Sequence, residues 1–179
     1  MDSEFGDGRH LFESLYKRHK DAVYAYAWSL AGELAEAEDL VHDVFLAVAT
    51  KLEGLDLSNS LRPYLIHAVK RRYIDRRRSV LASFRRLMAR PAPEASREVS
   101  ETVAARLGDD AAVIRAAVDR LPESQAEVVR MRIWAEMSAE EIGRALGIPA
   151  ETARTRWKTA IERLRAVLEK DYGDVHRRT

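Results

Sequence analysis

The sequence contains no cysteine among its 179 residues. This absence excludes disulfide bonds, thiolate zinc sites and cysteine nucleophiles. Glycine and proline are also few, with eight and five residues. No β-rich stretch alternates apolar and polar residues between hairpin turns, so the sequence favours helices. Because no signal peptide is recognisable and no apolar run approaches the length of a membrane span, we expect a cytoplasmic protein without direct membrane insertion.

The usual signatures of an enzyme are missing as well. The five histidines do not show a metal-ligand spacing such as H-E-x-x-H. There is no glycine-rich phosphate loop and no G-x-S-x-G nucleophile elbow. His42 and Asp43 are neighbours in sequence, and adjacent residues on a helix do not face each other. We therefore expect no catalytic residue, no metal, no cofactor and no small-molecule substrate.

A formal net charge of +1 conceals a strong segregation of charge along the chain. Residues 31–60 contain seven acidic residues against one lysine, whereas residues 70–90 contain nine basic residues against one aspartate. Such asymmetry suggests one surface for nucleic acid and another for a different partner. The alternative is a pair of solvated faces that only keep the protein soluble.

Residues 138–168 have the pattern of two helices joined by a tight turn. Ser138 and Glu141 form the capping-box pattern that starts a helix. Gly147 suits the left-handed backbone of a helix C-terminus, and Pro149 suits the first turn of a second helix. The apolar positions of the first helix recur at helical spacing: Ile142, Ala145 and Leu146.

The second of these helices separates an apolar side from a basic, polar side. Its apolar positions are Ala153, Trp157, Ala160, Ile161, Leu164 and Leu168. Its polar side carries Glu151, Thr152, Arg154, Thr155, Arg156 and Lys158. This arrangement is typical of a DNA-reading helix-turn-helix, although an αα-hairpin with a solvated face has the same pattern. Arginine is the usual bidentate partner of guanine, so Arg154 is the best candidate for base readout.

The first half of the chain shows three further helical patterns. Apolar periodicity predicts helices over residues 9–30, 35–53 and about 60–78. The second carries acidic and apolar residues on its outer side, a mixture that suits a protein contact. The third interleaves aromatic and basic residues, which can stack on unpaired bases and pair with phosphates.

These patterns predict an all-α protein with two small helical domains. The first domain spans residues 9–79, as a helical bundle. Proline, serine and glycine then mark a flexible linker over residues 80–108, with a short basic helix possible at 83–90. The second domain spans residues 109–171 and contains the helix-turn-helix, preceded by helices that begin near residues 110 and 122.

Four stretches carry a resemblance to a known family. Residues 37–46 read A-E-D-L-V-H-D-V-F-L, and residues 61–78 read L-R-P-Y-L-I-H-A-V-K-R-R-Y-I-D-R-R-R. Residues 121–129 read L-P-E-S-Q-A-E-V-V, and residues 137–156 read M-S-A-E-E-I-G-R-A-L-G-I-P-A-E-T-A-R-T-R. In this order and spacing they resemble the bacterial sigma factors of the extracytoplasmic-function (ECF) type, two-domain members of the sigma-70 family that direct RNA polymerase to promoters.

The resemblance implies a docking surface for the clamp coiled coil of core RNA polymerase on the second helix. The residues expected to lie on this surface or to support it are Asp39, Leu40, His42, Asp43 and Leu46. The resemblance also implies that the third helix and the loop before it capture and melt the −10 element, against which flipped non-template bases sit. The expected contacts are Asp56, Ser58, Asn59, Tyr64, His67, Lys70, Arg71, Tyr73 and Arg77.

The helix-turn-helix is expected, by the same resemblance, to read the −35 duplex in the major groove with the polar side of its second helix. The family more often has a larger aliphatic residue at Ala153 and Leu at Trp157, so we expect Trp157 to fill the volume that Ala153 leaves. The implied partners are core RNA polymerase, promoter DNA as duplex and as melted non-template strand, and an anti-sigma factor.

Two other functions remain open at this point. An ordinary helix-turn-helix repressor or activator would explain residues 138–168, but not the aromatic and basic third helix. An enzyme is the least favoured alternative because the sequence offers no catalytic constellation.

Overall fold

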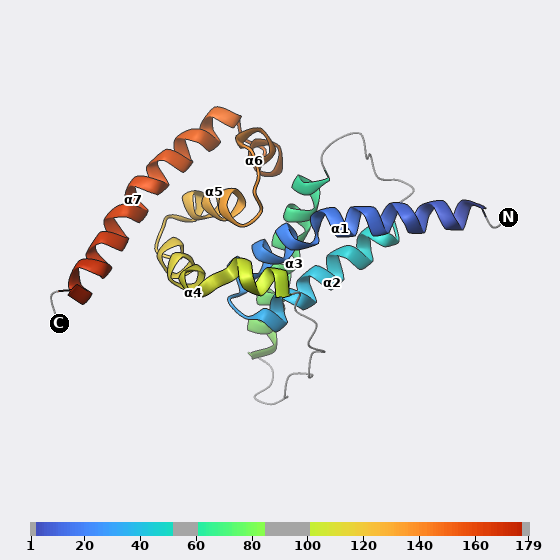
Figure 1. The fold of residues 1–179 in the computed structure, drawn as a ribbon, viewed down its shortest axis with the longest axis horizontal. Helices are drawn as coiled ribbons and strands as arrows, with labels where there is room; N and C mark the ends of the chain where they lie inside the picture. The colour runs from blue at the N-terminus through green and yellow to red at the C-terminus, as the bar shows by residue number, and fades with distance from the viewer. Residues whose placement is uncertain (1–2, 52–60, 85–100, 177–179) are drawn as a thin grey trace.

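The structure is a computed structural model that describes residues 3–51, 61–84 and 101–176. These residues form seven α-helices and no strand, which confirms the expected all-α fold. The helices are α1 (Ser3–Ala31), α2 (Leu34–Ala49), α3 (Arg62–Phe84), α4 (Glu101–Val118), α5 (Glu123–Ile133), α6 (Ala139–Leu146) and α7 (Ala150–His176). Figure 1 shows α1–α3 gathered in one half of the molecule and α5–α7 in the other, with α4 running from the first half to the second. Within the described ranges, no helix has the length and apolar character needed to span a membrane.

Several helix boundaries differ from the sequence prediction. Helix α2 ends at Ala49 rather than near residue 53, and the Thr50 hydroxyl donates to the Ala47 carbonyl at 3.0 Å. Helix α3 continues to Phe84 and α4 already begins at Glu101, so the expected linker is helical at both of its ends. Gly108 lies inside α4, because one glycine costs only about 1 kcal/mol and does not by itself end a helix. Residues 85–100, which include most of the possible short basic helix, lie outside the described residues.

The N-terminal half is a three-helix bundle with a closely packed apolar core. Each of its helices contributes side chains that are almost completely removed from solvent. They are Val23, Tyr26 and Ala27 of α1, Leu40, Val44 and Val48 of α2, and Leu65, Ile66 and Val69 of α3. Gly32 follows α1 with φ +79°, a conformation that glycine adopts without the penalty of a Cβ atom. The chain can therefore reverse directly into α2.

The capping box and the left-handed glycine predicted for the helix-turn-helix are confirmed, whereas Pro149 lies just before α7 and not in its first turn. The Glu141 backbone N–H donates to Ser138 Oγ at 3.1 Å, and the Ser138 N–H donates to Glu141 Oε2 at 2.9 Å, which completes the capping box. Gly147 ends α6 with φ +64°. A glycine that the sequence analysis passed over is equally important. A Cβ on Gly143 would lie 2.7 Å from the Ile148 carbonyl oxygen, so only glycine lets the turn approach α6 this closely.

Two of the expected core positions are less buried than predicted. Ile142 is 1% exposed and forms the centre of the helix-turn-helix core, whereas Leu146 is only half-buried. Ala153 is buried as expected, but Trp157 is half-buried and does not fully occupy the space beside it. Both side chains face hollows of the surface that are described below.

The two halves pack against each other, which the sequence analysis did not anticipate. Helix α3 contacts α6, and α1 contacts both α4 and α5. The rings of Trp28 and Trp134 are 6.4 Å apart across this boundary, and the Arg115 guanidinium lies 5.7 Å from the centre of the Trp28 ring. The buried apolar residues of both halves form one continuous cluster. The described residues of α3 nevertheless keep an exposed side, so this helix is not enclosed within the core.

We predict that Gly143→Ala destabilises the protein by about 1–3 kcal/mol, because the new methyl group meets backbone that cannot move away independently. The measurement is urea unfolding followed by circular dichroism. The exposed neighbour Arg144 provides the control, and Arg144→Ala should leave the midpoint nearly unchanged. Equal midpoints for the wild type and Gly143→Ala would contradict the close approach of the turn.

Candidate nucleic-acid interface

The polar side of α7 divides into a solvent face and a cleft face. Glu151, Arg154, Thr155 and Lys158 are exposed and follow the i, i+3, i+4, i+7 spacing of one helical face. Thr152 and Arg156, predicted to belong with them, are half-buried and lie further round the helix. The structure therefore brings four of the six predicted −35 residues together on one exposed surface.

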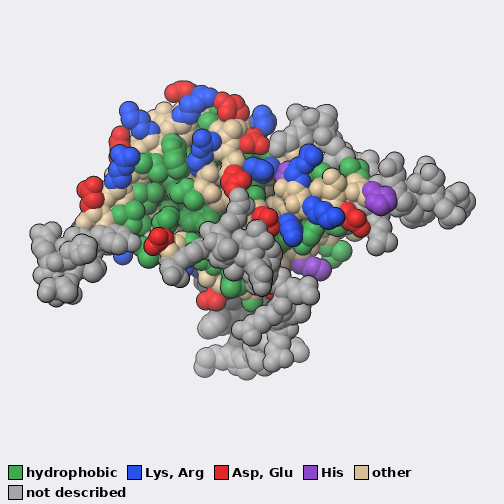
Figure 2. Space-filling model, in the orientation of Figure 1, with side chains coloured by type: hydrophobic (Ala, Val, Ile, Leu, Met, Phe, Trp, Pro, Cys, Tyr) green, Lys and Arg blue, Asp and Glu red, His purple; other side chains and the backbone are tan. Residues whose placement is uncertain are grey.

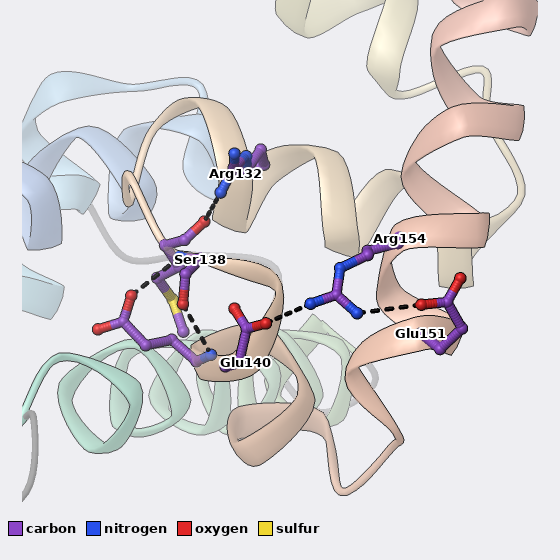
Figure 3. A network of polar contacts seen from close by, with 7 residues as sticks. Arg132, Ser138, Glu140, Glu151 and Arg154 are labelled. Atoms are coloured by element: carbon purple, nitrogen blue, oxygen red, sulfur yellow. Dashed lines mark hydrogen bonds and ion pairs between the residues drawn. The ribbon is translucent and has the colours of Figure 1, made fainter.

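Arg154 is held between two carboxylates on this surface. Its Nη1 donates to Glu151 Oε2 at 3.0 Å, and its Nη2 donates to Oε1 of Glu140. Figure 3 shows the guanidinium lying between these two side chains, at the point where α6 and α7 meet. A hydrogen bond to its own backbone N–H, followed by the positive charge of Arg154, lowers the pKa of Glu140. Glu140, which the sequence analysis did not single out, is therefore ionised at neutral pH.

The residues predicted for −10 recognition lie on two sides of α3. Tyr64, His67 and Arg71 are exposed and share one face of the helix. Tyr73 and Arg77 lie further round, where Arg77 Nη1 donates to the Tyr73 hydroxyl at 3.1 Å. The predicted loop contacts Asp56, Ser58 and Asn59 lie outside the described residues.

A cleft of about 560 Å³ lies beside the contact between α3 and the helix-turn-helix half. Its lining from α3 is His67, Lys70, Arg71, Ile74, Asp75 and Arg78. Its lining from the opposite half is Glu127, Met131, Ala145, Leu146 and Arg156. Residues predicted for −10 and for −35 contact thus line the same cleft.

Lys70, which the sequence predicts to contact DNA, is paired with a carboxylate in this structure. Its ammonium group contacts Oε1 of Glu127 on α5, and the two side chains are only 24% and 13% exposed. A lysine expected to contact DNA therefore joins the two halves of the molecule in this arrangement. The pairing could not be read from the sequence because the partners are 57 positions apart.

The outer face of α2 carries most of the predicted polymerase-docking residues. Asp39, His42 and Leu46 are exposed, and the partly exposed Asp43 shares their face. Leu40 is 0% exposed, so it can support this surface only from beneath. The guanidinium of Arg76 on α3 contacts Asp39 at 3.3 Å and Asp43 at 3.0 Å. Two ion pairs of Arg76 thus connect the acidic face of α2 to α3.

The helix-turn-helix half also carries an apolar groove of about 350 Å³. Its apolar lining includes Val128, Ile142, Ala153 and Trp157, and Arg132, Glu140 and Arg154 add charged groups. Sequence reasoning missed this groove because it assigned Trp157 wholly to the core. Figure 2 shows hydrophobic side chains gathered over this half of the molecule, with charged side chains around them. Such a surface suits protein contact more than contact with phosphates.

An exposed polar face on the second helix of a helix-turn-helix, together with a separate bundle that presents an aromatic and basic helix, defines a DNA-binding protein of two helical parts. Comparison with known families gives the same answer. Sigma-70 region 2 matches residues 15–81, and Sigma-70 region 4 matches residues 117–166. The chain belongs to the sigma-70 family as a factor of the ECF type, and this family consists of non-enzymatic transcription initiation factors.

Individual relatives agree over most of the chain. The ECF RNA polymerase sigma factor SigL of Mycobacterium tuberculosis is 27% identical over 161 residues, covering 89% of this chain and 90% of the relative. The fold matches CnrH in its complex with the cytosolic domain of CnrY, with a TM-score of 0.67, 24% identity and coverage of 91% and 90%. It also matches the sigma factor RpoE of Bartonella quintana in its complex with the anti-sigma factor NepR, with a TM-score of 0.65, 22% identity and coverage of 88% and 96%.

The boundary between the halves contains a buried histidine that the sequence analysis did not single out. His19 of α1 is 6% exposed, and burial, followed by the positive charges of Arg62 and Arg18, lowers its pKa from its ordinary value of 6.5. Arg62 itself donates to the Glu136 carbonyl at 3.1 Å, just before α6. The negative charge of Glu141 acts in the opposite direction. His19 is therefore neutral at pH 7 in the folded protein.

We predict that the folded state loses stability as the pH falls below about 6.5, because the unfolded chain then binds a proton that folded His19 resists. The measurement is urea unfolding at about pH 7.5 and 5.5. His19→Leu should reduce the pH dependence, whereas a substitution at the exposed His10 should leave it as in the wild type. An identical pH dependence in all three proteins would contradict this role of His19.

Proposed function

We propose that the protein binds core RNA polymerase in the cytoplasm and directs it to specific promoters. In this proposal α3 and the preceding loop read and melt the −10 element, while α7 reads the −35 duplex. The observation that carries the proposal is the pair of exposed faces on α3 and α7 in a chain of this family.

Reading of the −35 element would use the N-terminal turns of α7 in the major groove. Recognition helices of this motif place their first residues against base edges. Arg154 lies in the second turn of α7, so its planar donor fork is suited to the O6 and N7 atoms of guanine. Thr155 and Lys158 on the same face would contact phosphates and fix the register of the helix.

Melting at the −10 element would use the exposed face of α3. Tyr64 is 43% exposed and offers an aromatic surface on which an unpaired base of the non-template strand can stack. His67 and Arg71 on the same face would contact the strand. Unpairing costs a few kcal/mol per base, and the stacking and phosphate contacts offset this cost.

Docking on the polymerase would use the acidic and apolar face of α2. Leu46 is 56% exposed and lies beside His42 and Asp43, which gives an apolar contact point with a charged border. Because Arg76 joins Asp39 and Asp43 to α3, docking would also fix the orientation of the helix that meets the melted strand.

Simultaneous reading of both elements requires the two halves to separate. The elements lie about 25 base pairs apart, which corresponds to roughly 85 Å along the DNA axis. In the arrangement described here, α3 contacts α6 and both reading helices line one cleft. We infer that this closed arrangement belongs to the protein before it engages the promoter, and that polymerase binding favours the open form.

A protein regulator is the remaining proposed partner. The sigma factor RpoE, which this fold matches, is described in complex with the anti-sigma factor NepR. We propose that an anti-sigma factor also binds this chain, and the apolar groove beside Trp157 is a suitable surface for it.

The function is tested by adding the purified protein to core polymerase on fragments of the source genome and mapping unpaired thymines with permanganate. We expect short opened regions that depend on both the protein and the polymerase. Tight binding of the protein alone to duplex DNA, with no opening in the presence of polymerase, would instead indicate an ordinary helix-turn-helix repressor or activator.

We predict that Lys70 and Glu127 are energetically coupled in the free protein by about 0.5–3 kcal/mol, because the pair is largely buried and crosses the boundary. The measurement is a double-mutant cycle of unfolding with Lys70→Met and Glu127→Gln. Arg71 and Asp75 provide the matched control, since this pair is 77% and 57% exposed with a separation of 4.0 Å. Equal and negligible coupling in the two cycles would show that the closed arrangement is not populated.

A further inference from the structure

The reading face of α7 contains an arrangement that DNA binding alone does not require. The Arg154 guanidinium is held by carboxylates that arrive from two different helices, Glu140 from the first turn of α6 and Glu151 from the first turn of α7 (Figure 3). The pair with Glu151 is local, because both residues belong to one helix. The pair with Glu140 crosses the turn, so it fixes Arg154 relative to α6.

We propose that Glu140 is a specificity-determining residue that positions Arg154 for a base edge and prevents it from serving as a phosphate anchor. This inference rests on the proposed function of α7 and deepens it. Glu140 acts through Arg154 and is therefore a positioning residue, not a base contact in its own right.

Positioning follows from the donor geometry of arginine. A guanidinium has five N–H donors in a planar fork, and the two ion pairs engage one donor on each Nη atom. One donor on each Nη atom and the Nε–H remain for a guanine edge. Because Glu140 and Glu151 hold the fork before DNA arrives, less side-chain freedom is lost when it binds.

Discrimination follows from charge. The first helix of this motif crosses the DNA backbone, so a carboxylate at the start of α6 faces the phosphate side of the interface. Glu140 is half-exposed and ionised, and it disfavours any pose in which Arg154 turns toward a phosphate. The carboxylate weakens binding to every duplex, but it weakens binding to wrong sequences more.

The test uses holoenzyme assembled from core polymerase and the full chain, with a library of promoter-length duplexes randomised in the upstream region. Wild type should select a guanine at one position that Arg154→Ala no longer distinguishes. Glu140→Gln should lower the preference at that same position by about fivefold and raise binding to unselected duplex. Glu140→Asp keeps the charge but shortens the reach, so it should lose the preference while keeping weak binding to unselected duplex.

Glu162 provides the matched control, because it is exposed on α7 and Glu162→Gln removes the same charge away from Arg154. If Glu140→Gln and Glu162→Gln both keep the wild-type preference, the inference is overturned while the proposed function stands. A changed preference at a different base pair would also overturn it, because Glu140 would then read a base directly. If the wild-type holoenzyme selects no upstream sequence, the −35 assignment of α7 fails as well.

Discussion

The contact between α3 and the helix-turn-helix half is the constraint on which the rest of the structure depends. It places the two candidate reading helices on opposite walls of one cleft, and it commits Lys70 to Glu127 rather than to DNA. The contact is mainly apolar in its interior, because the buried clusters of the two halves are continuous. Polar groups reinforce its edge, as where Arg62 donates to backbone carbonyls just before α6.

Because of this contact, the free protein and the proposed promoter-bound protein favour opposite arrangements of the two halves. The closed arrangement removes apolar surface from water, which favours it in the free protein. The proposed promoter reading requires the opposite, since in that proposal each half reaches a DNA element far from the other. A partner can shift such an equilibrium only if it binds the open form better than the closed form. In the proposed function, polymerase docked on the outer face of α2 would be such a partner, and the groove beside Trp157 would be left for an anti-sigma factor.

The sequence predicted the features that depend on residues close together in the chain. The capping box, the left-handed Gly147 and the face formed by Glu151, Arg154 and Lys158 all follow from spacing along one or two helices. A packing reason for Gly143 was within reach, because an isolated glycine inside a helical pattern costs stability, but the close approach of the Ile148 carbonyl was not. The sequence could not predict contacts between distant segments. The pairing of Lys70, the burial of His19 and the clamp of Glu140 on Arg154 all depend on how separate helices meet.

The central claim is that the two halves pack against each other in the free protein and move apart when the protein engages the promoter. Because the chain has no cysteine, spin labels can be placed at two introduced cysteines, one at Arg72 on α3 and one at Glu162 on α7, both exposed. Electron–electron double resonance then measures the distance between them. The account predicts one narrow distance distribution in the free protein and a much longer distance once polymerase and melted promoter DNA are bound. The same distance in the open complex as in the free protein would contradict it.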